Sequence, residues 1–177
     1  MKTRLAVALM GLLAHLPLPL LRGLGWLLGR LLFVLAAPRR KVALRNLALC
    51  FPEVPEAQRR AWARATFVVF CQTFLDRSWL WAGSEALVRR RVKLVGAVHE
   101  LDGDTPTIVF APHFYSMDAG GLALPLNTAR EFTSIFATNP DPALDAWFMG
   151  GRQRFGNVRM LNRADGVTVL VSLHQVQ

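Results

Sequence analysis

The sequence is poor in cysteine. Only Cys50 and Cys71 occur among 177 residues, and neither lies in a CxxC pair or beside a cluster of other possible metal ligands. Isolated cysteines of this kind are typical of reduced core residues rather than of disulfides or metal sites. We therefore expect no disulfide and no metal centre, which agrees with a cytoplasmic setting.

Acidic residues are also scarce: 12 Asp and Glu stand against 21 Lys and Arg, for a net charge of +9, while 53% of the residues are hydrophobic. An apolar and basic composition is typical of a protein that sits on an anionic membrane. The basic residues recur in clusters: Arg39–Lys41, Arg59–Arg60, Arg89–Arg91 and Arg152–Arg154. Because apolar runs separate these clusters and no helix-turn-helix, zinc-finger or RNA-binding signature accompanies them, nucleic acid is not an expected partner.

The longest uncharged apolar run lies only at the lower edge of the usual length of a membrane span. The stretch Leu5–Leu21 carries no formal charge, but it holds 17 residues and contains Pro17 and Pro19. A spanning helix needs about 20 apolar residues, and an internal proline kinks a helix. A cleaved signal peptide is disfavoured, because apolar character continues past a normal signal core and no A-x-A site follows.

Two membrane interpretations remain for residues 1–38. One is a single kinked span; the other is a bent hairpin or interfacial segment, in which Arg22 and Arg30 reach up to the headgroups. A buried helical hairpin in a soluble protein is the alternative. We expect residues 1–38 to be a membrane anchor segment, with the basic cluster after it facing the cytoplasm, and residues 39–177 to form a second domain.

Beyond the anchor segment, hydrophobic spacing predicts alternating helices and strands. Predicted helices are Glu56–Gly83, Ser116–Leu126 and Ala143–Phe155, with a further helix at Val171–Gln177; predicted strands are Arg91–Gly96, Thr107–Ala111 and Phe132–Ala137. This order predicts an α/β fold, with an N-terminal membrane-associated helical segment followed by helices and a mixed sheet.

The segment HFYSMD, from His113 to Asp118, follows one of the predicted strands and enters a predicted helix. Ligands and catalytic groups favour the carboxyl ends of strands in α/β sheets. On a continuous helix, positions five apart point about 140° from one another, so the two side chains meet only if His113 lies in the loop. The carboxylate would then orient the imidazole as a general base for a substrate alcohol. The alternative is a loop histidine and a helix-start carboxylate without catalytic function.

Four passages carry a recognisable pattern: RNLALCFPE (residues 45–53), VKLVG (92–96), the HX4D motif HFYSMD (113–118), and NPDPALD (139–145) followed by GRQR (151–154). They resemble motifs of the lipid A biosynthesis acyltransferase family, the late lauroyl- and myristoyl-type enzymes of the glycerolipid acyltransferase superfamily.

This resemblance implies transfer of a fatty acyl chain from acyl-carrier protein to a hydroxyl of a lipid A precursor, without an acyl-enzyme. His113 would be the general base and Asp118 its orienting carboxylate, both catalytic. Arg152 would bind a substrate anion or stabilise oxyanion charge, and Arg154 is a second candidate for substrate binding. The alternative for both arginines is a solvated basic helix face. No metal or other cofactor is implied.

The same resemblance implies a place at the cell inner membrane, with the catalytic part on the cytoplasmic side and acyl-carrier protein, a lipid acceptor and the membrane as partners. Because members of this family are longer, we expect the acyltransferase domain at 39–177 to be incomplete at its C-terminus. Acylation of another lipid acceptor, or a catalytically inactive membrane-bound remnant, are the alternative functions.

Overall fold

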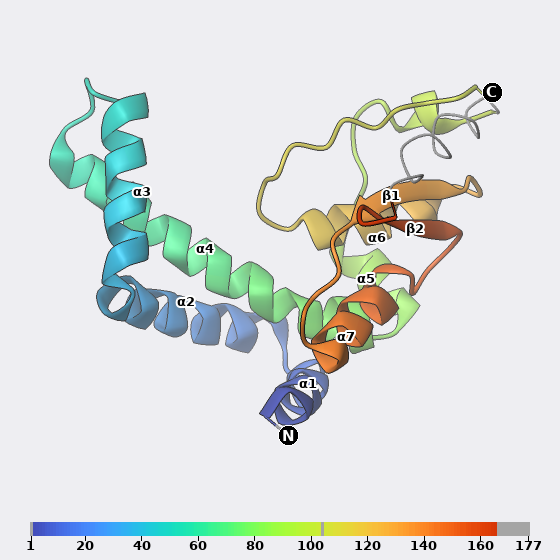
Figure 1. The fold of residues 1–177 in the computed structure, drawn as a ribbon, viewed down its shortest axis with the longest axis horizontal. Coiled ribbons are helices and arrows are strands. Elements are labelled where there is room, and N and C mark those ends of the chain that lie inside the picture. The colour runs from blue at the N-terminus through green and yellow to red at the C-terminus, as the bar shows by residue number, and fades with distance from the viewer. Residues whose placement is uncertain (1, 104, 166–177) are drawn as a thin grey trace. The chain divides into compact units, whose positions relative to one another are not determined.

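The computed structural model describes residues 2–103 and 105–165, and this part of the chain is mostly helical (Figure 1). The helices are α1 (Lys2–Leu13), α2 (Leu18–Leu35), α3 (Ala37–Cys50), α4 (Glu56–Ala82), α5 (Glu85–Arg91), the 3-10 helix η1 (Val98–Leu101), α6 (Met117–Asn127) and α7 (Pro142–Arg152). The strands are β1 (Phe132–Phe136) and β2 (Val158–Asn162). The chain divides into two compact units: Leu16–Asp76, and the described part of Met1–His15 with Arg77–Gln177.

In the unit Leu16–Asp76, two glycines bring α2 against α4. A Cβ added at Gly25 would lie 2.6 Å from Cγ of Gln72, and one added at Gly29 would lie 2.4 Å from Cα of Val68. Glycine is required at both positions because any larger residue would meet the side chain or backbone of α4. This contact fixes which face of α2 is turned toward α4.

Polar and apolar contacts reinforce the same helix pair. Arg22 of α2 forms an ion pair of 2.8 Å with the buried Asp76 of α4. Farther along, Phe33 packs edge-on against Phe67, with 5.4 Å between ring centroids. These contacts run along much of α2, so α4 occupies one face of α2.

In the other unit, β1 and β2 form a parallel two-stranded sheet, with a register that runs from Phe132 opposite Val158 to Phe136 opposite Asn162 (Figure 1). The crossover between them contains α7, as parallel strands require. Asp141 caps the N-terminus of α7, since its carboxylate accepts from the backbone N–H groups of Ala143 and Leu144. Side-chain capping of this kind begins a helix at a defined residue.

Several sequence predictions are confirmed. The helices predicted at Glu56–Gly83, Ser116–Leu126 and Ala143–Phe155 correspond to α4, α6 and α7, and the strand predicted at Phe132–Ala137 corresponds to β1. The kink predicted from Pro17 is present as a break, because α1 ends at Leu13 and α2 begins at Leu18. The helix predicted at Val171–Gln177 lies outside the described residues.

Two predicted strands are wrong, and with them the mixed sheet. In place of a strand at Arg91–Gly96, α5 continues to Arg91 and the next residues have no regular structure. Three arginines close α5, and basic side chains favour a helix C-terminus. The strand β2 was not predicted from the sequence. In the described residues the sheet is two-stranded and parallel, formed by β1 and β2.

The run Thr107–Ala111 is apolar but is not a strand. Ile108 is 86% exposed and Phe110 is 89% exposed, and no described segment pairs with this run. A strand exists only through its ladder to a neighbour, so an apolar sequence alone does not make one. As a result, the segment that enters the HFYSMD motif is irregular backbone.

The only described helix long and apolar enough to cross a membrane, by length and composition, is α2. It begins near the end of the predicted run Leu5–Leu21, and α1 is a shorter apolar helix.

Candidate active site

The structure places Asp118 in the first turn of α6, where the backbone turns sharply. Ser116, at the N-cap, has a φ of 67°, which is the left-handed region. Its carbonyl accepts the first hydrogen bonds of the helix, from the N–H groups of Ala119 and Gly120. A carboxylate in the first turn is stabilised by the partial positive charge of a helix N-terminus.

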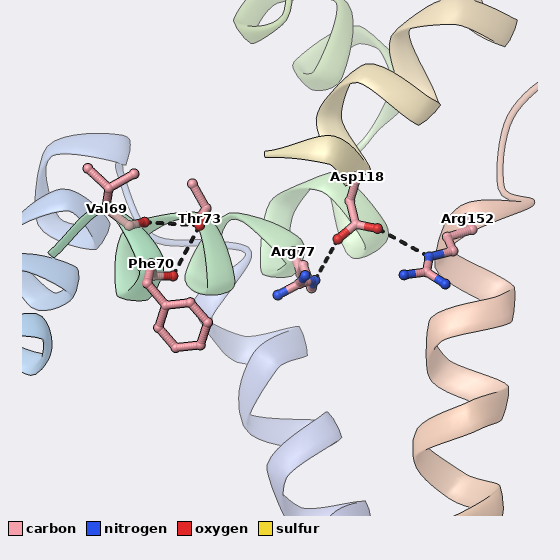
Figure 2. Close-up of polar contacts among 6 residues, drawn as sticks. All are labelled: Val69, Phe70, Thr73, Arg77, Asp118 and Arg152. Carbon is pink, nitrogen blue, oxygen red and sulfur yellow. Dashed lines mark hydrogen bonds and ion pairs between the residues drawn. The ribbon is translucent and has the colours of Figure 1, made fainter. Parts of the chain in front are cut away.

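Two arginines from other helices hold the Asp118 carboxylate (Figure 2). Nε of Arg77, near the end of α4, donates to Oδ2 across 2.8 Å, and Nε of Arg152, at the end of α7, donates to Oδ1 across 3.2 Å. The Asp118 side chain is 12% exposed, against 22% for Arg77 and 36% for Arg152. Because each oxygen has its own charged donor, the plane of the carboxylate is fixed.

Aromatic rings support both guanidinium groups. That of Arg77 lies 5.6 Å from the ring centroids of Trp81 and Phe148, and that of Arg152 lies 5.2 Å from Phe148. Cations over aromatic faces are attracted by the ring quadrupole. The rings therefore help to hold the arginines where they meet Asp118.

The glycine of the GRQR segment makes this arrangement possible. A Cβ at Gly151 would lie 2.3 Å from Cδ2 of Trp81. Trp81 also packs edge-on against Trp147, with 4.4 Å between ring centroids. Only a glycine lets α7 come close enough to Trp81 for the next residue, Arg152, to reach the carboxylate.

His113 lies outside this cluster. It is exposed, in the irregular segment before α6, and the described residues contain no hydrogen bond or ion pair between it and Asp118. The backbone turns tightly there, because the N–H of Phe114 donates to the carbonyl of Pro112 across 2.7 Å. Of the predicted site residues, the structure brings Asp118 and Arg152 together. The general-base role of His113 stays a prediction.

Arg154 contacts backbone. Its guanidinium donates to the carbonyl of Leu80, across 3.0 Å, and to the carbonyl of Gly83. These groups belong to the last turn of α4 and its end, where carbonyls have no partner within the helix. Partial burial lowers the pKa of Arg154. Its role in substrate binding stays a prediction, and it would require Arg154 to exchange these hydrogen bonds.

The two cysteines lie in different environments. Cys50 is exposed on α3, whereas Cys71 is buried on α4, and burial raises the pKa of the Cys71 thiol. The thiolate is the reactive form of cysteine, so Cys71 is held in its unreactive form. Among the described residues, no group of three or more His, Cys, Asp or Glu side chains is arranged to hold a metal ion.

The sequence analysis missed Arg77. It lies 41 residues before Asp118, within an apolar helix, and no local spacing links the two. A signal was present nonetheless, because Asp76 and Arg77 are the only formally charged residues between 65 and 82. Charged residues are almost never fully buried unless they are paired.

Comparison with known proteins agrees with the family that the four sequence motifs resemble. The family model described as bacterial lipid A biosynthesis acyltransferase matches residues 2–175. The chain is 27% identical over 172 residues to the lipid A biosynthesis lauroyltransferase of Escherichia coli (strain K12), covering 92% of this chain and 53% of that protein. It is 28% identical over 166 residues to a lipid A biosynthesis acyltransferase of Haemophilus influenzae, covering 91% and 52%.

A third relative, the lipid A biosynthesis myristoyltransferase of Escherichia coli (strain K12), is 29% identical over 152 residues, covering 84% of this chain and 45% of that protein. The chain thus spans about half the length of these curated relatives. No solved structure matches it.

Proposed function

Because the chain belongs to the bacterial lipid A biosynthesis acyltransferase family, we propose that it transfers a fatty acyl chain from acyl-carrier protein to a hydroxyl of a lipid A precursor. The observation that carries the proposal is the ion pair between Asp118 and Arg152. It joins the HX4D segment to the GRQR segment, so two passages that resemble the family's motifs meet at one carboxylate.

The proposed reaction begins with His113, which removes the proton from the acceptor hydroxyl. The alkoxide oxygen forms a bond to the thioester carbonyl carbon, the carbon–sulfur bond breaks, and the thiolate of acyl-carrier protein leaves and takes the proton back from His113. Asp118 orients the imidazole and stabilises its protonated form. The exposure of His113 leaves it open to a large lipid acceptor.

Arg152 has the properties of an oxyanion-stabilising group. Its side chain is more exposed than that of Arg77, and its hydrogen bond to Asp118 is longer. A substrate oxygen that gains negative charge in the transition state can therefore engage its remaining N–H groups. Charged donors aimed at developing negative charge are among the largest contributions to catalysis.

We place the protein at the inner membrane, with the site on the cytoplasmic side, where acyl-carrier protein is available. On α2, the buried residues are Leu21, Gly25, Gly29 and Phe33, and the last three of them contact α4. Four of the exposed apolar residues of α2, Leu20, Leu27, Leu31 and Val34, project from the opposite side at helical spacing. This second face is available to lipid, while the first is occupied by α4.

The position of α4 along one face of α2 favours the interfacial interpretation of this segment over a clean span. The guanidinium groups of Arg40 and Arg64 lie 5.5 and 5.6 Å from the ring centroid of Phe33, at one end of α2. Charged side chains are costly at the centre of a bilayer, whereas they are stable at headgroup depth. A helix that inserts one apolar face and keeps α4 on the other satisfies both conditions.

The test is an acyl-transfer assay with the protein as its gene encodes it, in membranes. Acyl-carrier-protein thioester is the donor, and a lipid A precursor and a lysophospholipid are offered as separate acceptors. Product on the lipid A precursor supports the proposal. Product on the lysophospholipid alone would instead show a glycerolipid acyltransferase. No product, beside an active Escherichia coli lauroyltransferase in the same assay, would show an inactive remnant.

A further inference from the structure

The Asp118 carboxylate has two arginine partners, and they differ in how firmly they are held. Arg77 makes the shorter contact, 2.8 Å against 3.2 Å, and its side chain is the less exposed. Its guanidinium lies against two rings, Trp81 and Phe148, whereas Arg152 lies against Phe148 alone among the described contacts. Of the two donors, Arg77 is the more fixed.

The chain position of Arg77 explains this rigidity. Arg77 and Trp81 are four residues apart on α4, so their side chains lie on one face of the helix. Trp81 is buried and packs edge-on against Trp147 and Phe148 of α7. The rings of Trp81 and Phe148 thus lie against the guanidinium of Arg77, while Nε of Arg77 donates to Oδ2 of Asp118.

We propose that Arg77 is a positioning residue: it holds Asp118 through Oδ2 and leaves Oδ1 as the oxygen that orients His113. This inference rests on the proposed function. A carboxylate oxygen has two lone pairs, so Oδ1 can accept from the imidazole of His113 as well as from Arg152. When Arg152 turns toward a substrate oxyanion, the contact from Arg77 keeps the carboxylate plane in place. Asp118 can then orient the general base without losing its own orientation.

Arg77 touches no reacting atom in this account, so its effect must pass through Asp118. A purely structural arginine would instead contribute equally whether or not residue 118 carried a charge. A double-mutant cycle separates the two, because non-additive effects arise between groups that act through one another.

The experiment compares Arg77→Gln in the unaltered protein and in an Asp118→Asn background, in the acyl-transfer assay. We expect a fall of about 10²-fold in kcat, the cost of misplacing a catalytic group, with KM for the acyl donor unchanged. In the Asp118→Asn background the same substitution should change kcat by less than about threefold, as expected for groups that act as a unit. Arg89→Gln is the matched control, because Arg89 forms an exposed ion pair with Glu85 within α5; it should leave kcat unchanged.

Arg77→Lys is the second variant, for use if Arg77→Gln fails to fold. It keeps a cation beside the rings of Trp81 and Phe148. An ammonium lacks the fixed N–H geometry of a guanidinium, so kcat should still fall, and this loss too should vanish with Asp118→Asn. Equal losses in the two backgrounds, or a rise in KM without a fall in kcat, would overturn the inference. If the unaltered protein is active and the cycle is additive, only the role of Arg77 fails; if the unaltered protein makes no product, the proposed function fails with it.

Discussion

The guanidinium of Arg152 donates to the carboxylate of Asp118 across 3.2 Å, and so joins two motifs through residues that are 34 positions apart in the sequence. One motif enters α6 and the other ends α7. Their meeting makes a single candidate site from what the sequence presents as two signatures.

Replacing Arg152 by Ala should lower kcat by about 10² to 10³-fold, the loss typical of removing one oxyanion-stabilising donor. Steady-state acyl transfer measures this. Arg163→Ala is the control, because Arg163 is an exposed arginine just after β2. Comparable losses in the two variants would point to a general effect of positive charge rather than to a role for Arg152.

Gly151→Ala should destabilise the fold by about 1–3 kcal/mol, the usual cost of overpacking, because its Cβ would meet Trp81 at 2.3 Å. Gly150→Ala, in the same helix, meets nothing within 4 Å and should instead stabilise by about 0.5–1 kcal/mol, from helix propensity. Urea unfolding of the two variants checks this. Equal shifts of the midpoint in the same direction would contradict the close approach of α7 to Trp81.

Some of the helices and strands could be predicted from the sequence, and others could not. Periodic apolar spacing located α4, α6, α7 and β1, because burial on one face leaves a local pattern. It failed at Thr107–Ala111, since a strand depends on a partner elsewhere in the chain. It likewise failed to connect Arg77 with Asp118, because their pairing depends on how α4 and α6 pack.

The candidate site divides in the same way. Motif resemblance named Asp118 and Arg152, and the structure joins them. It also named His113, which the structure leaves exposed and unpaired with Asp118. The resemblance also named Arg154 as a candidate for substrate binding, yet its hydrogen bonds go to backbone carbonyls at the end of α4. No local sequence pattern indicates these hydrogen bonds.

The exposed apolar face of α2, which carries Leu20, Leu27, Leu31 and Val34, should mediate membrane binding. A Leu27→Glu, Leu31→Glu double variant should bind anionic vesicles at least about tenfold more weakly, since each buried leucine contributes about 1.5–3 kcal/mol. Ala57→Glu, at an exposed position at the start of α4, adds negative charge away from that face and should bind nearly as well as the unaltered protein. Equal weakening in both would indicate attraction by net charge alone.

The stability of α7 should depend on pH through Asp141. The hydrogen bond from the Thr3 hydroxyl lowers the pKa of Asp141, as does the N–H of Leu144; partial burial opposes them, and the N–H of Ala143 adds to the lowering. A lowered folded-state pKa gives stability that is present above the unfolded value of about 3.9 and is lost as pH falls through the folded value.

Asp141→Ala should therefore unfold at a lower temperature than the unaltered protein at neutral pH, and the difference should narrow in acid. Thermal unfolding, followed by circular dichroism at neutral pH and in acid, measures this difference in unfolding temperature. Asp102→Ala, in an exposed turn, should show no such narrowing. A difference for Asp141→Ala that stays constant into acid would contradict an ionised cap.

The most direct test of the account compares His113→Ala with His99→Ala in acyl transfer from acyl-carrier protein to a lipid A precursor. Both histidines are exposed in the same unit of the structure, and His99 lies on η1, so the pair isolates the role of the HX4D segment. We predict that His113→Ala loses transfer by at least about 10²-fold, the contribution of a general base, while His99→Ala retains it. Full activity in His113→Ala would contradict the proposed mechanism.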